Sequence, residues 1–402
     1  MTPTATKSKL LDLPRPVWLL GCVSLATDSA SEAIYPLLPF FLTQVLGAGA
    51  VSLGIVEGAA EAANSLLKIG SGRLADRSPS KRPLVLIGYG LSSAVRPFIA
   101  VAQTWLQVFA IRVFDRVGKG IRGAPRDAML AAWATPDTRG KVYGFHRSMD
   151  HLGAVVGPAL ASLFLWLYPT AYRTLFALTI VPGAIAVLLI FFVPEDASAS
   201  ANARLAPDTT AAGQPGTGGE PLPGNLTAFF VVLTLFTLGN SSDAFLLLRL
   251  TDAAGSVRFV PLMWAALHVV KASVSVFGGA WSDRIGRRTV IATGWLVYAV
   301  VYGGFALSAS LPALLTWFFV YGLYFGFAEG TEKALVVDLA PVTRRGFAFG
   351  VYNAVQGIGA FVASVVFGVI WKVFGSAAAF FTGATLAVVA TALLLAVVPR
   401  RH

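Results

Sequence analysis

Charged residues are scarce in this chain of 402 residues, and their scarcity excludes a soluble globular protein. Only 13% of the residues are Asp, Glu, Lys or Arg, compared with roughly 25% in a typical soluble domain. In contrast, 56% of the residues are hydrophobic. The chain is therefore predicted to be an integral membrane protein.

Cysteine, methionine and histidine are also rare. The single cysteine, Cys22, excludes an internal disulfide and any cysteine-based metal cluster. Four methionines are too few to line a path for a soft metal ion, and the histidines show no metal-ligand spacing. We therefore expect neither a metal site nor a cofactor.

Apolar runs of about 20 residues, the length that crosses a bilayer core of roughly 30 Å, recur along nearly the whole chain. A transmembrane β-barrel would instead show shorter segments of alternating hydrophobicity. The runs predict an all-α fold with twelve transmembrane helices. These helices are expected at 16–46, 52–74, 84–102, 105–133, 142–167, 173–193, 225–248, 260–281, 290–306, 311–337, 347–371 and 377–398.

The net charge of +11 is explained by membrane topology rather than by nucleic-acid binding. Basic residues gather in short loops on one side of the predicted helices, and the positive-inside rule places that side in the cytoplasm. They are Lys81, Arg82, Arg139, Lys141, Arg284, Arg287, Arg288, Arg344 and Arg345. Both chain ends fall on the same side. We expect a monomeric, multi-pass protein of the inner membrane with cytoplasmic termini, in contact with lipid.

Residues 195–224 divide the predicted helices into two sets of six. This stretch is rich in Ala, Ser, Thr, Pro and Gly and has almost no large apolar residue. It cannot bury a core, so it is predicted to be a flexible cytoplasmic linker. The expected domains are an N-terminal six-helix bundle at 1–194 and a C-terminal six-helix bundle at 225–402.

The two halves repeat each other in sequence. Residues 72–77 read Gly-x-x-x-Asp-Arg, as do residues 279–284, which lie 207 positions later. Residues 139–144 read Arg-Gly-x-x-x-Gly, as do residues 345–350, which lie 206 positions later. Two landmarks at nearly one spacing indicate an internal duplication. A parallel repeat of this kind is typical of transporters whose halves are related by a pseudo-two-fold axis and hold substrate between them.

The fourth predicted helix carries a cationic stripe. Its members, which lie three or four residues apart and so share one face, are Arg112, Arg116, Lys119, Arg122 and Arg126. One charge facing lipid at the centre of a bilayer costs about 2.5–3.5 kcal/mol on insertion scales. These side chains are therefore expected to face water or partners inside the protein.

Carboxylates in neighbouring helices are the candidate partners of this stripe. They are Asp28 and Glu32 in the first helix, Glu57 and Glu61 in the second, and Asp150 in the fifth. Carboxylates that face a low-dielectric cavity can also bind and release protons, and an adjacent Arg112 would make that affinity depend on substrate. Asp28 or Glu32 is the leading predicted proton carrier, followed by Glu57 or Glu61. The simpler interpretation is a set of fixed structural ion pairs.

Two further sets of polar residues complete the predicted site. The substrate cavity is assigned to Tyr35, Asn64, Arg116, Lys119, Asp150, Asp243, Lys271 and Glu329. Gates at the cytoplasmic ends are assigned to Asp76, Arg77, Arg126, Asp127, Asp283, Arg284, Glu332 and Lys333. By the 206-residue offset, Arg126-Asp127 corresponds to Glu332-Lys333, an inverted charge pair that can meet across the interface.

Residues 279–288, Gly-Ala-Trp-Ser-Asp-Arg-Ile-Gly-Arg-Arg, resemble the signature loop between helices 8 and 9 of the major facilitator superfamily. The likeness covers essentially the whole chain. It implies that Asp283 caps a neighbouring helix while Arg284 pairs nearby, which holds the cytoplasmic side closed in the outward-facing state. A carboxylate at a helix N-terminus contributes about 0.3–1 kcal/mol. The first copy departs from the pattern at 78–80, where Ser-Pro-Ser stands.

Two further resemblances imply proton-coupled export. Arg112 stands where proton-coupled exporters of this superfamily often carry a helix-4 arginine, and Gly153-Ala-Val-Val-Gly157-Pro158 resembles the helix-5 motif associated with antiporters. The simpler interpretation of that motif is close packing of small residues with a proline kink. Three patterns together are typical of a bacterial subgroup of the family, which implies the bacterial inner membrane: Ala-Thr-Asp28-x-x-x-Glu32, Arg-Val-Gly-Lys-Gly at 116–120 and Pro-Arg-Asp at 125–127.

The leading hypothesis is export of a small organic molecule in exchange for protons by alternating access. The alternative is uptake of an organic anion, a carboxylate or phosphate ester, bound by the helix-4 cations. Unpaired cations in the interior would favour uptake, and fully paired cations would favour export. An enzyme is the least favoured class, because His146-x-x-x-Asp150 is one residue short of an acyltransferase-like spacing and no nucleophile constellation accompanies it.

Overall fold

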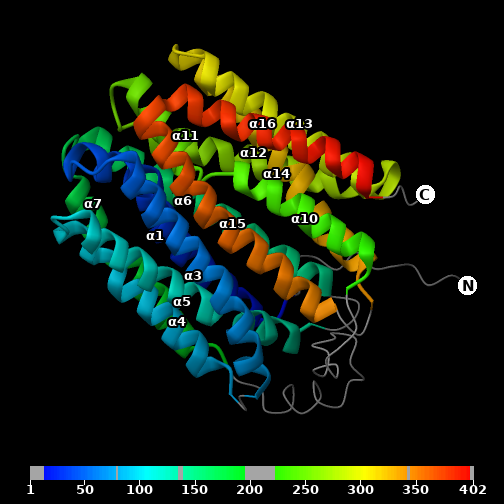
Figure 1. Cartoon of the computed structure of the whole chain (residues 1–402). Coiled ribbons are helices and arrows are strands. Elements are labelled where there is room, and N and C mark those ends of the chain that lie inside the picture. Colours follow the sequence, from blue (N-terminus) through cyan, green and yellow to red (C-terminus); the bar gives the residue numbers. More distant parts are fainter. Residues whose placement is uncertain (1–12, 78–79, 135–138, 195–221, 342–344, 399–402) are drawn as a thin grey trace, which may run out of the picture.

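The computed structural model describes residues 13–77, 80–134, 139–194, 222–341 and 345–398 (Figure 1). Within these ranges all regular secondary structure is helical, which confirms the predicted all-α fold. The predicted linker lies outside the described residues, apart from its last three, 222–224.

The first half of the chain forms six helical rods. Their α-helices are α1 (Arg15–Ile34), α2 (Leu38–Phe40), α3 (Ala50–Arg77), α4 (Arg82–Val95), α5 (Trp105–Ala132), α6 (Arg139–Leu167), α7 (Tyr172–Leu178) and α8 (Ile180–Phe191). The first rod joins α1 to α2 and continues as a π-helix at Phe41–Val45, the third extends α4 by a 3₁₀ segment at Arg96–Val101, and the sixth joins α7 to α8.

The second half also forms six rods. They are α10 (Gly224–Gly239) with α11 (Ala244–Ala254), then α12 (Val260–Ile285), α13 (Arg287–Leu307), α14 (Leu311–Leu339), α15 (Arg345–Phe374) and α16 (Ser376–Val397). Figure 1 shows the two sets of rods as two bundles lying side by side. The arrangement agrees with the predicted two-bundle, twelve-helix architecture.

Proline interrupts the first rod. A proline has no N–H to donate, and its ring clashes with the preceding turn. The α-helix therefore gives way to a 3₁₀ turn at Tyr35–Leu37, which contains Pro36, and Pro39 follows in α2. The seventh rod is also broken, between Gly239 and Ala244, and its sequence gave no such expectation.

Among the described residues, eight helical stretches are long and apolar enough to cross a bilayer. The described part of α12 adds a shorter apolar stretch, Val260–Val274. The first rod, α3 and α5 are outside both sets, and they carry many of the charged residues of the predicted site, among them Asp28, Glu57 and Arg112. Their charges lower the hydropathy, so these three rods depend on neighbouring helices to cover their polar faces.

The two halves meet where α3 packs on α15 and α6 packs on α12, a contact surface that we call the seam. A Cβ atom at Gly54 of α3 would lie 2.2 Å from the carbonyl oxygen of Ser364 in α15. A Cβ atom at Gly368 of α15 would lie 2.6 Å from the carbonyl oxygen of Ala50 in α3. Small residues allow helices in membranes to approach this closely. On the other side, Ser162 Oγ of α6 donates a hydrogen bond of 2.7 Å to the carbonyl oxygen of Arg258, just before α12.

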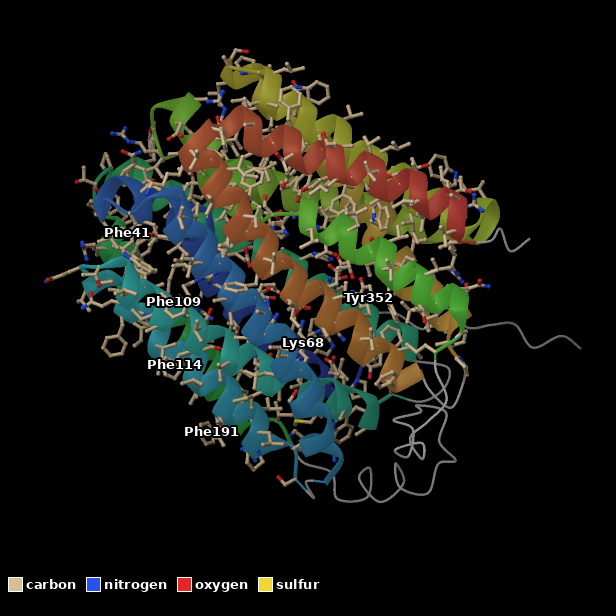
Figure 2. The ribbon with its side chains drawn as sticks, viewed as in Figure 1. Phe41, Lys68, Phe109, Phe114, Phe191 and Tyr352 are labelled. Carbon is tan, nitrogen blue, oxygen red and sulfur yellow. The ribbon has the colours of Figure 1, made fainter. Side chains whose placement is uncertain are left out.

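Side chains divide between the outer surface and the seam. Phe114 and Phe191 project from the outside of the first bundle (Figure 2) and are exposed, as expected for contact with lipid. Lys68 of α3 lies toward the second half, where it interacts electrostatically with Lys333. The polar faces of the charged rods are therefore turned inward.

Candidate functional site

A buried ion pair joins α5 to α3. The Arg112 guanidinium donates two hydrogen bonds to the Glu57 carboxylate, from Nε at 3.0 Å and from Nη2 at 2.9 Å. The two residues are 3% and 5% exposed. The paired geometry matches the two oxygens of a carboxylate with the planar fork of a guanidinium. Arg112 is thus neutralised by a partner, as buried charges require.

A second pair extends this network to α4. Asp115 accepts a hydrogen bond of 2.8 Å from Arg96 Nη2 and lies 3.6 Å from Arg112 Nη1. Nearby, Arg122 donates to Ser92 Oγ at 2.8 Å and stacks over the Tyr89 ring at 4.3 Å. Neither Arg96 nor Asp115 was among the residues predicted for the site. Asp115 lies between two cations of the stripe, which is the sequence signal that could have identified it.

Asp28 of α1 has a different environment from Glu57. Among the described residues, no hydrogen-bond donor or cation lies within bonding distance of its carboxylate, and it interacts electrostatically with Asp150 and Lys119. Asp150 of α6 accepts a hydrogen bond from Ser24 Oγ and lies 3.6 Å from His146 Nδ1. The structure therefore places two acidic groups near each other, and among the described residues Asp150 has close partners whereas Asp28 has none.

The glycine motif of α6 packs directly on α1. A Cβ atom at Gly153 would lie 2.7 Å from the carbonyl oxygen of Leu25 and 3.0 Å from Asp28 Cβ. A Cβ atom at Gly157 would lie 2.2 Å from the carbonyl oxygen of Ser29. Pro158 follows within the helix. The motif thus allows close packing of α6 on the turn of α1 that carries Asp28.

Tyr35 and Glu32 join the two halves. Tyr35 Oη lies 3.4 Å from Ser242 Oγ, and its ring centre is 5.7 Å from the Arg112 guanidinium and 5.0 Å from the Trp264 ring. Glu32 accepts a hydrogen bond of 2.8 Å from Trp264 Nε1. The buried ion pair of the first half is therefore connected to the second half through aromatic side chains.

Asp243 and Lys271 form the corresponding pair of the second half. Asp243 lies at the break between α10 and α11, and its carboxylate is 3.3 Å from Lys271 Nζ. Tyr321 Oη donates to the same carboxylate at 2.6 Å. Both Asp243 and Lys271 were assigned to the predicted cavity, and the structure brings them together.

Charged side chains become exposed toward the end of the seam that is predicted to be cytoplasmic. Arg147 of α6 lies 3.7 Å from Glu329 of α14, and these side chains are 60% and 46% exposed. Glu329 also accepts a hydrogen bond of 3.0 Å from Lys333. Glu61 is exposed and accepts hydrogen bonds from Asn64 and Ser65 of its own helix. This end of the polar surface is accessible to water.

The predicted gate pairs do not meet in this structure. Arg126 pairs with the adjacent Asp127 at 2.9 Å. Glu332 is instead buried within the second half, where it accepts hydrogen bonds from Trp295 at 2.9 Å, Tyr352 at 3.1 Å and Gln356 at 3.2 Å. The side chains of the other gate residues, Asp76, Arg77, Asp283 and Arg284, lie outside the described part of the structure.

Two cations of the stripe differ from Arg112 in their surroundings. Arg116 is buried and Lys119 is partly buried, and neither has a hydrogen-bond acceptor or carboxylate within bonding distance among the described residues. Within that part of the chain the stripe is thus paired at Arg112 and has no close partner at the next two positions on the same face. Over the described residues, no three His, Cys, Asp or Glu side chains are grouped in a way that could hold a metal ion.

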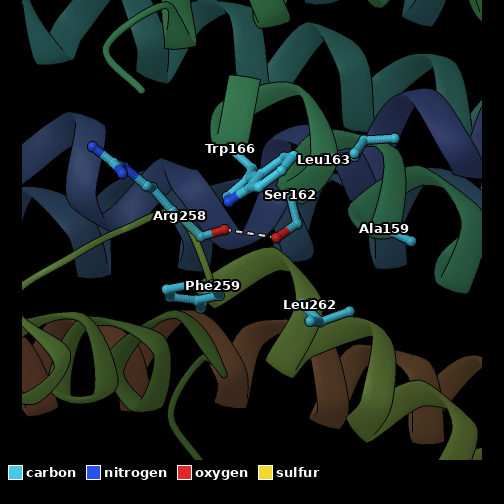
Figure 3. A pocket seen from close by; sticks show the side chains of 7 residues that line it. All are labelled: Ala159, Ser162, Leu163, Trp166, Arg258, Phe259 and Leu262. Atoms are coloured by element: carbon cyan, nitrogen blue, oxygen red, sulfur yellow. Dashed lines mark hydrogen bonds between the residues drawn. The ribbon is translucent and has the colours of Figure 1, made fainter. Parts of the chain in front are cut away.

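A groove of about 250 Å³ lies on the outer surface between α6 and α12, at the Ser162–Arg258 hydrogen bond (Figure 3). Its lining is mostly apolar and includes Leu163, Trp166, Phe259 and Leu262. None of the buried ion-pair residues lines it. The polar site between the halves is therefore separate from this groove.

The model of the Major Facilitator Superfamily matches residues 17–250 and 225–402. An uncharacterized MFS-type transporter of Methanocaldococcus jannaschii is 31% identical over 393 residues, which cover 96% of this chain and 95% of that relative. The chain belongs to the major facilitator superfamily. This finding confirms the resemblance of residues 279–288, and it identifies a multi-pass membrane protein of a transporter family rather than of an enzyme family.

Other superfamily members agree in sequence and in fold. The multidrug resistance protein MdtH of Cronobacter sakazakii is 25% identical over 324 residues, which cover 79% of this chain and 77% of that protein. A crystal structure of a variant of the nucleoside transporter NupG has a TM-score of 0.81 at 14% identity, with 96% of this chain and 100% of that chain covered. The latter likeness establishes the shared fold of the superfamily.

Proposed function

We propose that this superfamily member exports a small organic molecule in exchange for protons, and that Asp28 carries the proton. The observation that carries the proposal is the position of Asp28: its carboxylate has no close partner among the described residues, and Gly153 of the antiporter-like motif packs against its Cβ atom. An ionised carboxylate without a donor is costly in a low-dielectric interior, and binding a proton removes that cost.

The other predicted proton carriers are already engaged. Glu57 receives two hydrogen bonds from Arg112, an arrangement that holds a carboxylate in its charged form. Glu32 accepts from Trp264, and Glu61 is exposed beside donors of its own helix. Proton binding at these positions would have to break or compete with existing contacts. Among the described residues, Asp28 has no close partner to lose when it gains or releases a proton.

The packing of α6 on α1 supplies a route from proton binding to movement. Gly153 and Gly157 bring α6 into direct contact with the backbone of α1. Because the two helices are closely packed there, a change of charge at Asp28 acts directly on the contact between them. The same helix, α6, forms part of the seam through Ser162. Protonation would thus bias the contact between the halves, which is what alternating access requires. The name of the relative MdtH, a multidrug resistance protein, supports the direction of export.

The sign of a pH change tests this function. Purified protein is reconstituted into liposomes that contain a pH-sensitive dye, and members of a panel of organic amines and organic carboxylates are added outside. In an exchanger, substrate that enters down its gradient drives protons out, so the lumen becomes alkaline. In a symporter the same addition makes the lumen acidic.

Asp28→Asn should abolish the substrate-driven pH change. The matched control is Asp252→Asn, which alters an exposed carboxylate outside the predicted site and should keep the wild-type response. Movement of labelled substrate accompanied by an undiminished proton flux in Asp28→Asn would refute the role of this residue.

Uptake of an organic anion is the second candidate function. Arg116 and Lys119, which have no close acceptor among the described residues, favour it, since a carboxylate or phosphate ester could pair with both. Luminal acidification on addition of a carboxylate, lost in Arg116→Gln, would establish uptake and exclude exchange.

A further inference from the structure

The ammonium group of Lys271 is held in a cage of aromatic rings in the second half. Lys271 Nζ lies 3.5 Å from the centre of the Phe325 ring, 4.9 Å from that of Trp264 and 5.8 Å from that of Tyr321. The Asp243 carboxylate is 3.3 Å away. We call the three rings together with Asp243 the aromatic cage.

These groups are the ones that recognise an organic cation. The faces of aromatic rings carry partial negative charge, and proteins that bind ammonium ligands surround them with such faces. A carboxylate supplies the counter-charge and accepts a hydrogen bond from the ammonium. Lys271 is itself a primary alkylammonium on a four-carbon stem. Its position therefore shows what kind of group the cage accepts.

The aromatic cage lies where the two halves meet. Asp243 is in the break between α10 and α11, and backbone that leaves the helix at membrane depth is tolerated where it is buried in protein or lines a cavity. Trp264 also donates to Glu32 of the first half. One wall of the cage is thus fixed by a contact between the halves that alternating access must break.

We propose that the aromatic cage is a binding site for the ammonium group of an organic amine, and that Lys271 is an internal competitor displaced when the amine binds. The proposal rests on the proposed export function, because it names the class of molecule exported. Asp243 is the carboxylate of the cage, so an incoming amine and Lys271 compete for its charge. Lys271 has a flexible stem and can move its charge toward water.

An anionic ligand fits this cage poorly. A carboxylate placed among the ring faces would meet their partial negative charge and that of Asp243. Lys271 is the cation of the cage that would attract such a carboxylate, and its charge is already neutralised by Asp243. The cage and the unpaired Arg116 and Lys119 of the first half therefore favour ligands of opposite charge, and an experiment can decide between them.

Three probes of nearly the same shape separate the possibilities: phenethylamine, which is cationic; phenethyl alcohol, which is neutral; and hydrocinnamate, which is anionic. Their binding to the purified full-length protein is measured by isothermal titration calorimetry at neutral pH. The variants are Lys271→Met, which removes the competitor, and Lys271→Arg, which keeps its charge.

Lys271→Met should bind phenethylamine at least about tenfold more tightly than wild type does, while Lys271→Arg should show no gain. Phe325→Leu removes the nearest ring and leaves the Lys271–Asp243 pair in place. It should weaken amine binding roughly 2- to 30-fold, the range of a cation–π contact. This variant keeps the proposal testable if Lys271→Met fails to fold, which a thermal unfolding curve reveals.

Three results would overturn the aromatic cage as an amine site. They are equal affinity for the three probes, binding of hydrocinnamate that Lys271→Met abolishes, and absence of phenethylamine binding in both wild type and Lys271→Met. Equilibrium binding is measured without a proton gradient, and it does not depend on the direction of transport. If substrate-driven proton flux occurs without amine binding, the cage alone is refuted, whereas amine binding without a substrate-driven pH change refutes only the exchange mechanism.

Discussion

Replacing both members of the Arg112–Glu57 pair should destabilise the protein less than replacing either one. Both side chains are almost fully buried and bonded to each other through two hydrogen bonds. Removing one partner leaves an uncompensated charge in the interior, which costs about 3–5 kcal/mol. Replacing both by apolar residues of similar volume is often neutral or stabilising. The neighbouring Asp115 keeps its contact with Arg96 at 2.8 Å, so it retains a counter-charge in the double variant.

The assay is a double-mutant cycle of Arg112→Met and Glu57→Met. Unfolding is followed by circular dichroism while a denaturing detergent is titrated into mixed micelles. We expect each single variant to lose about 3–5 kcal/mol and the coupling energy to exceed about 3 kcal/mol. The control cycle uses Arg126→Met and Asp127→Met, because that pair is more exposed and should couple by no more than about 1 kcal/mol.

The cycle also separates structure from function at Arg112. If each single variant of the buried pair costs less than about 1 kcal/mol, or if the two costs simply add, the pairing is not what stabilises these charges. If the double variant is stable and still exchanges protons for substrate, Arg112 acts only as the counterion of Glu57. A stable double variant without transport would instead assign Arg112 a part in coupling.

Two further predictions concern packing and the contact between the halves. Gly157→Ala places a Cβ atom 2.2 Å from a backbone oxygen of α1, so it should lower stability by about 1–3 kcal/mol through overpacking. The control Gly303→Ala, where nothing lies within 4 Å of the added Cβ atom, should raise stability by about 0.5–1 kcal/mol. The two variants are compared by thermal unfolding. Equal stability would contradict the close packing of α6. Trp264→Phe removes the donor to Glu32 and should cost about 1.5–3 kcal/mol in the same detergent titration, whereas Trp166→Phe, at an exposed site, should cost little. A negligible loss in Trp264→Phe would show that this bond does not hold the halves together.

The class of fold was readable from the sequence, because hydropathy and charge are local properties of each segment. Twelve apolar runs and two repeated loop motifs predicted a duplicated bundle, and the match of the superfamily model to residues 17–250 and 225–402 agrees with it. Local composition also indicated which helices carry interior charges. The first rod, α3 and α5 are too polar to count as apolar spans, and they hold Asp28, Glu57 and Arg112.

Which charge pairs with which was decided by tertiary structure. Arg112 and Glu57 are 55 residues apart in sequence, and Glu32 meets Trp264 across 232 residues. The inner-end pairs that the repeat suggested do not form, because Glu332 points into its own half toward Trp295. Ion pairs depend on how each helix is rotated and how closely its neighbours approach. Those quantities are set by side-chain packing over the whole molecule. Hydropathy and charge along the sequence therefore determined which helices carry interior charges, and only the packed helices determined which of these charges are buried and which partners they have.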